Sequence, residues 1–375
     1  MNLNTHFSQR DWERIEHDWT AWWAHELDRP MVMINGTDLS GKIKIGSSVA
    51  AQKLGTRRYT LMDLLSRKIP SLYSLDDPVE EIIDGYTQML SCIRCYGDVW
   101  PRWWVDFGPG IAAGFLGSNV GADENTVWFD MDEPVDLDTW QAKYDTNNAW
   151  YKKVCEITQA AVDCWGDQMN VGVTDLGGNL DILASLRGTQ QLLMDCIENP
   201  EGVMRCVDQI TDVWKQYYRD IAEITDQSGR GNTCWAHLWT PEKYYMLQCD
   251  FSYMISPRMF KKFVLPDIAA CCDELEYGFY HLDGKGEIPH LKSLLELDRL
   301  RGIQWVPGDG APPQEEWLEL LKQIINAGKL CQLYVSAEGA LKITRELGGK
   351  GFAFYIGERM NKADAEAYLK EIHSI

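Results

Sequence analysis

Short apolar runs, each followed by a polar loop and then a helical pattern, recur along most of this chain. The runs are Met31–Ile34, Val99–Phe107, Met169–Leu176, Thr233–Trp239, Gly278–Asp283, Gly302–Pro307, Leu330–Val335 and Phe352–Ile356. They are continuous rather than alternating, as expected of strands buried on both faces of a parallel sheet. Eight strand–helix units in one chain favour a TIM (β/α)8 barrel over a doubly wound sheet.

The chain is expected to form a single domain, because no Gly/Ser-rich or Pro-rich linker divides its 375 residues. Residues 1–75 are interpreted as an N-terminal elaboration packed on a barrel formed by residues 76–375. The elaboration should contain an amphipathic helix that begins at Ser8, a possible N-cap with Asp11 three residues further on, and ends before Pro30. Its apolar face repeats tryptophan at helical spacing.

The charge balance argues against several kinds of partner. The sequence has 36 Lys and Arg against 56 Asp and Glu, which gives a formal net charge of −20. An acidic surface of this size repels nucleic-acid phosphates and anionic lipid. No run approaches the roughly 18 apolar residues that a membrane span needs, and the N-terminus lacks the apolar core of a signal peptide. A cytoplasmic protein that binds neither nucleic acid nor membrane is therefore predicted.

Ionisable side chains stand at or after the ends of the predicted strands. Asp175, His237 and Asp250 are candidate catalytic residues, and His281, Asp283 and Glu358 follow the same placement. The carboxyl ends of barrel strands converge on one mouth, so these side chains should lie together if the barrel is correct. A hydrogen-bonded structural role is the alternative for each residue taken alone.

His281 and Asp283 form the most specific local pattern for a functional site in this sequence. Residues two apart on a strand point to the same side, so both side chains can face the mouth together. A histidine and a carboxylate so placed suit Zn²⁺ with a third protein ligand and an open position. They suit equally well a hydrogen-bonded acid/base pair without metal.

Aromatic residues near the predicted strand ends are candidates for contact with a flat substrate. The chain has 16 tryptophans, and the candidates are Trp103, Trp104, Trp235, Trp239 and Tyr355. Packing in the core is the alternative for each of them.

Two stretches of the sequence resemble the uroporphyrinogen decarboxylase superfamily. Ser256-Pro-Arg-Met-Phe-Lys-Lys-Phe-Val-Leu-Pro266, preceded by Gln248-Cys-Asp250, is similar to a signature helix of that superfamily. Leu186-Arg-Gly188, with Asp195 and Asn199-Pro-Glu201, resembles its Leu-Arg-Gly turn and Asn-Pro-Glu helix start. The resemblance runs from about residue 97 to the C-terminus, and it also implies a TIM barrel.

The resemblance is closer to the zinc methyltransferases of the superfamily than to its decarboxylases. The decarboxylases use an Arg-Gln-Ala-Gly-Arg motif to hold substrate propionates, and the matching region Asp28–Gly36 has none. The methyltransferases bind zinc through His-x-Cys-Gly and a later Pro-Gly-Cys turn. Here the matching positions read His281-Leu-Asp-Gly284 and Ile356-Gly-Glu358. The resemblance therefore implies zinc bound by His281, Asp283 and Glu358, with carboxylates in place of both cysteines.

The resemblance implies a function in methyl transfer. Carboxylates are harder donors than thiolates and make the ion better at polarising an oxygen or nitrogen leaving group. We therefore expect the methyltransferase component of an O-demethylase, which moves a methyl group from a small donor, such as a methoxylated aromatic, to a corrinoid. The chain has no Asp-x-His-x-x-Gly cobalamin motif, so the corrinoid is expected on a separate protein. A metal-free decarboxylase or lyase acting on a small acidic substrate, a non-catalytic ligand-binding barrel, and a homodimeric assembly remain open.

Overall fold

The computed structural model describes residues 3–38, 74–122 and 127–375. Its central sheet has the strand order β2-β1-β11-β10-β9-β8-β7. Neighbouring strands from β7 to β1 run parallel, and only β2 runs antiparallel to its neighbour. The bounds are β1 Met31–Thr37, β2 Ile93–Gly97, β7 Tyr244–Leu247, β8 Tyr277–Asp283, β9 Leu300–Val306, β10 Leu330–Val335 and β11 Phe352–Ile356.

Two smaller ladders complete the strands. β3 (Arg102–Trp104) pairs in parallel with β6 (Asn170–Gly172), and β4 (Asn119–Ala122) pairs antiparallel with β5 (Val127–Asp130). Within the described ranges, no ladder joins β3 or β6 to the central sheet. The fold is thus mixed α/β with a predominantly parallel central sheet, and the closed ring of strands expected of a TIM barrel is not seen.

One predicted strand is wrong. Residues Thr233–Trp239 form no strand: Cys234 makes a single parallel bridge to Val173, and Asn232 pairs antiparallel with Thr240. We call residues 232–240 the inserted hairpin. The strand that pairs with β8 is β7, four buried residues that directly precede the Gln248-Cys-Asp250 segment. The apolar content of the hairpin resembles that of a strand because it is buried against the sheet.

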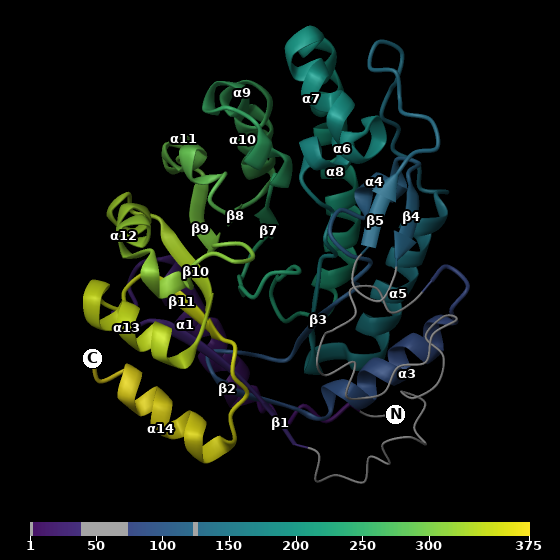
Figure 1. Ribbon diagram of the computed structural model, residues 1–375. Helices are drawn as coiled ribbons and strands as arrows, with labels where there is room; N and C mark the ends of the chain where they lie inside the picture. Colours follow the sequence, from purple (N-terminus) through teal and green to yellow (C-terminus); the bar gives the residue numbers. More distant parts are fainter. Residues whose placement is uncertain (1–2, 39–73, 123–126) are drawn as a thin grey trace.

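The helices flank the strands (Figure 1). Helices α9 to α14 lie outside strands β7 to β11, whereas α3 to α8 lie on the side of β3. In the described part of the chain, no helix has the length and apolarity needed to cross a membrane. The bounds are α1 Gln9–Trp23, α3 Val79–Leu90, α4 Ala112–Phe115, α5 Ala149–Trp165, α6 Asn179–Arg187, α7 Thr189–Glu198, α8 Pro200–Asp226, α9 Pro257–Phe263, α10 Leu265–Glu274, α11 Leu291–Leu295, α12 Leu318–Asn326, α13 Ala337–Leu347 and α14 Lys362–Ile372.

Helix α1 packs against the amino-terminal ends of the strands. Its start is the predicted one, because Ser8 and Asp11 form a capping box. The indole of Trp22 donates to the carbonyl of Phe352 at the first position of β11, at 3.1 Å. Trp23 is buried, donates to the carbonyl of Trp239 at 2.7 Å and packs on Tyr277, the first residue of β8. The opposite, carboxyl-terminal ends of the strands are left for a site.

Replacing Trp23 with alanine should therefore destabilise the whole domain. Deletion of a buried indole costs about 3–5 kcal/mol, and the carbonyl of Trp239 would also lose its donor. Urea denaturation followed by circular dichroism measures the change in unfolding free energy. Trp128→Ala serves as the control, because Trp128 is 44% exposed and should lose far less stability. Equal losses in the two variants would contradict the assigned role of α1.

Candidate metal site

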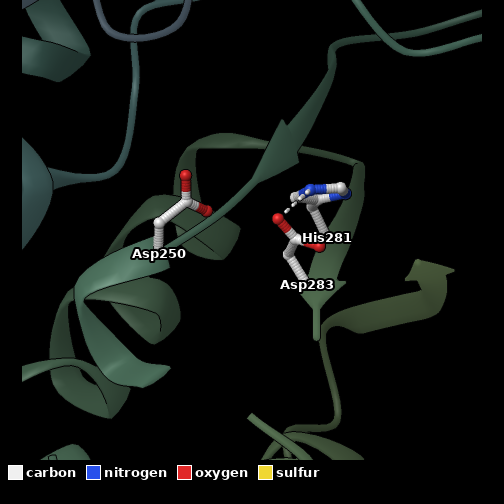
Figure 2. Close-up of side chains that lie close together, drawn as sticks. All are labelled: Asp250, His281 and Asp283. Carbon is white, nitrogen blue, oxygen red and sulfur yellow. Dashed lines mark ion pairs between the residues drawn. The ribbon is translucent and has the colours of Figure 1, made fainter. Parts of the chain in front are cut away.

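Three side chains meet at the carboxyl ends of β7 and β8. His281 and Asp283 lie two apart on β8, and Asp250 opens the short 3₁₀ turn Asp250–Met254 after β7. Each residue offers a ligand atom, and these atoms lie within 4.8 Å of one another. Figure 2 shows the Asp250 carboxylate facing the His281–Asp283 pair across a gap. His281 Nε2 and Asp283 Oδ2 are 4.0 Å apart. This arrangement, which we call the β7–β8 cluster, has the nitrogen and oxygen donors of a divalent-metal site.

Asp250 is held by an acidic residue that the sequence did not single out. The Asp181 carboxylate on α6 accepts hydrogen bonds from the backbone amides of Asp250 at 3.0 Å and Phe251 at 2.7 Å. Helix α6 can approach this closely because a Cβ on Gly178, its N-cap residue, would collide with the carbonyl of Gln248. Asp181 thus positions the backbone that carries Asp250.

Glu287 supports the other side of the cluster. It is fully buried, and its Oε2 accepts from the amide of Asp283 at 3.3 Å and lies 3.5 Å from the hydroxyl of Tyr280. Burial, together with the charge of Asp250, raises the pKa of Glu287 to about 10. Glu287 is therefore a neutral acid near pH 7. No local sequence pattern indicates this role, because Glu287 lies in a turn after β8.

The electrostatics of the cluster favour a cation. Burial raises the pKa of Asp250, the negative charge of Asp283 raises it further, and His281 opposes the shift. Burial also raises the pKa of Asp181 well above its usual range, with Asp250 contributing. Buried carboxyl groups gathered in this way keep protons or attract a positive ion, and a bound divalent cation would favour the ionised form of Asp250.

The structure places Glu358 outside the β7–β8 cluster. Both carboxylate oxygens accept from the backbone amide of Ala337, at 3.2 and 3.1 Å, at the start of α13. The carboxylate thus interacts with a helix amino terminus. Among the described residues, Asp250 rather than Glu358 supplies the third donor beside His281 and Asp283. The structure therefore does not bring Glu358 together with His281 and Asp283, and its predicted role as a metal ligand stays a prediction.

Asp175 and His237, the other candidate catalytic residues, lie elsewhere around the strand ends. The Asp175 carboxylate accepts from the amide of Gly177 at 2.9 Å, and burial raises its pKa to about 8 despite that bond. His237, on the inserted hairpin, lies 3.2 Å from the Tyr334 hydroxyl through Nδ1. Its ring packs on Tyr355 with 4.1 Å between centroids.

The predicted aromatic residues divide into two groups. Trp235 packs edge-on against His281, with 5.3 Å between the ring centroids, and Trp104 packs edge-on against His237, with 6.4 Å between the centroids. Both tryptophans therefore lie beside candidate site residues. Trp103 instead packs with Tyr86 and Trp165 in the helix layer, and Trp239 is buried beside α1. The structure thus places Trp103 and Trp239 away from His281, because strand alternation turns Trp103 toward the helices and the hairpin carries Trp239 back to α1, and their predicted contact with substrate stays a prediction.

A cavity of about 500 Å³ adjoins the cluster between α6, β5 and the turn after β7. Asp250 and Asp181 stand in its wall together with Asp130. Phe129, Phe251 and Met254 provide apolar surface. No Lys, Arg or His is present among the described residues that line it. A pocket with this lining suits a small neutral or cationic molecule and disfavours a polyanion.

Comparison with known proteins finds a similar fold but no similar sequence. No protein-family model and no curated protein matches the sequence. A solved methyltransferase from Methanosarcina mazei is similar in structure, with a TM-score of 0.59 over 96% of this chain and 98% of that one. The two sequences are 12% identical. At that identity, what the two proteins share is the fold.

The raised pKa of Glu287 predicts a pH-dependent cost to stability. An acid whose pKa is higher in the folded state binds more protons folded than unfolded, so stability falls as pH rises between the unfolded value and about 10. Glu287→Gln keeps the acceptor for Asp283 and removes this loss. The variant should gain on the order of 1 kcal/mol over wild type per pH unit in that window.

Thermal unfolding of both proteins at intervals from pH 6 to about 9 measures this effect. Glu296→Gln is the matched control, because Glu296 is exposed and its substitution should leave the pH profile unchanged. Parallel profiles for wild type and Glu287→Gln would show that Glu287 is ionised in the folded protein.

Proposed function

We propose that this protein is a metal-assisted methyltransferase that moves a methyl group from a small donor to a corrinoid carried by a separate protein. The observation that carries the proposal is the β7–β8 cluster, one imidazole and two carboxylates in reach of one ion beside a cavity of about 500 Å³. The fold shared with a methyltransferase supports it. The donor set is that of zinc or a similar divalent ion.

We also infer that the chain is an interrupted (β/α)8 barrel of the uroporphyrinogen decarboxylase superfamily. The superfamily-like motifs occupy structural positions: Arg187 pairs with Asp195 at 2.6 Å, and Ser256 caps α9 through the amide of Met259 at 3.3 Å. Asn199 caps α8 at the amide of Gly202. Such residues maintain a common scaffold, whereas the chemistry depends on the strand ends.

The chain's own residues suggest how a donor would be handled. A bound divalent ion would act as a Lewis acid on an oxygen leaving group, which fits the hard donors of this cluster. Trp235 lies edge-on against His281 and provides a flat apolar surface beside it. The acidic lining of the cavity disfavours donors with several carboxylates and excludes uroporphyrinogen-like substrates from the proposal.

Metal binding is the first test. Chelator-treated protein should bind one Co²⁺ or Zn²⁺ in calorimetric titration, and Asp250→Asn, His281→Ala and Asp283→Asn should each weaken binding at least a hundredfold. The Co²⁺ complex should lack the intense near-ultraviolet band of thiolate coordination. Glu358→Gln is the control and should bind normally, because that carboxylate contacts the start of α13. Loss of binding in Glu358→Gln with retention in Asp250→Asn would restore the ligand set predicted from sequence.

Methyl transfer is the second test. Metal-loaded protein with reduced cobalamin as a stand-in acceptor and a panel of methoxylated aromatics should form methylcobalamin, followed by absorbance. Asp283→Asn should reduce the rate at least tenfold because it removes a metal ligand. Transfer at the same rate by chelator-treated protein would contradict the metal-assisted proposal.

A metal-free lyase or decarboxylase is the second candidate, and one observation favours it. The pKa of about 8 at Asp175 makes this buried carboxyl a proton donor near neutral pH. Activity on a small acidic substrate that survives chelation and is lost in Asp175→Asn would favour this reading over methyl transfer.

A further inference from the structure

Three side chains on adjacent strands form a hydrogen-bonded row behind the β7–β8 cluster. The parallel register pairs His281 on β8 with Gln304 on β9, and Gln304 with Gln332 on β10. Register partners project from the same face of a sheet, so the three side chains stand in line. Both glutamines are fully buried.

The bonds along this row have a direction. Gln304 Oε1 contacts His281 Nδ1, and Gln304 Nε2 donates to Gln332 Oε1. A carboxamide oxygen only accepts, so the proton of a neutral imidazole must lie on Nδ1 in this arrangement. The other ring nitrogen, Nε2, lies on the side of Asp283 at 4.0 Å.

We propose that Gln304 is a positioning residue that holds neutral His281 as the Nδ1–H tautomer and turns the Nε2 lone pair toward Asp250 and Asp283. Gln332 fixes the orientation of the Gln304 amide, because it accepts from Gln304 Nε2. In the reverse direction, Gln304 would donate to Nδ1, and the Nε2–H would point at the carboxylates. Only the first direction leaves His281 able to bind a cation, since a metal ligand must offer a lone pair.

The far end of the row does not set its direction. Gln332 Nε2 has no hydrogen-bond partner among the described residues, so the row ends there. The neighbour of Gln332 in the ladder, Ala353, offers no polar side chain. The direction is therefore read at the His281 end, where Gln304 Oε1 contacts His281 Nδ1 and leaves Nε2 on the side of Asp283.

The tautomer can be measured without any metal. In chelator-treated protein labelled with ¹⁵N-histidine, long-range proton–nitrogen spectra distinguish the tautomers, and loss of one of the seven histidine signals in His281→Ala assigns it. At a pH where the imidazole is neutral, His281 should be protonated at Nδ1. Protonation at Nε2 in the wild type would overturn the proposal whatever the variants do.

Substitutions at Gln304 test whether this residue sets the tautomer of His281. Gln304→Met removes the acceptor and should release His281 to the Nε2–H form that free histidine prefers, whereas Gln304→Glu keeps an acceptor and should retain Nδ1–H. Gln323→Met is the control, since Gln323 is exposed on α12. An unchanged tautomer in Gln304→Met would show that Gln304 does not set it.

The consequence for metal affinity rests on the proposed function. Gln304→Met should weaken Co²⁺ binding about 10- to 100-fold, as loss of outer-shell partners does elsewhere, and Gln304→Glu should restore most of it. Nδ1–H protonation without metal binding would count against the proposed function and leave the role of Gln304 standing. Metal binding of equal strength in wild type and Gln304→Met would overturn the role of Gln304 and leave the metal site intact.

Discussion

The parallel pairing of the strands from β7 across to β1, and the register that it fixes at their carboxyl ends, is the constraint on which this structure depends. A shift of one residue between β8 and β9 would turn His281 and Gln304 to opposite faces of the sheet. The same pairing brings Asp250, just beyond β7, to the level of the β8 residues His281 and Asp283. The tryptophans of α1 pack against the other end of these strands. The carboxyl ends of the strands are thereby left for the candidate site.

The acidic residues around the cluster have different roles. Asp181 uses both carboxylate oxygens on backbone amides, and Glu287 holds its proton because burial raises its pKa. The negative charge available for a ligand is therefore that of Asp250 and Asp283. Two carboxylates and a neutral imidazole balance one divalent ion, which makes the cluster electrically suited to a metal although many more acids surround it.

The apolar runs in the sequence predict most of the strands correctly. Seven of the eight predicted runs contain a strand of the structure, and the His281–Asp283 pair follows from alternation on β8. The sequence predicts a strand at Thr233–Trp239 where the structure has a hairpin, because burial of a hairpin and burial of a strand require the same apolar residues. Asp181 and Glu287 were missed because their importance comes from contacts across the fold. Glu358 was assigned to the metal from a resemblance, but local geometry turns it to α13.

The inserted hairpin contributes side chains to the surface beside the β7–β8 cluster. Its ends are tied together by Asn232 and Thr240, and Arg102 holds the carbonyl of Trp235 at 3.1 Å. The side chains it presents, Trp235 and His237, touch His281 and Tyr355 on the sheet. In a continuous barrel, the surface next to the reacting groups is encoded by strands whose register cannot change. Here part of it belongs to a hairpin outside the strand ladders, so substitutions at Trp235 or His237 would change the surface beside His281 and Tyr355 while the pairing of the strands stays the same.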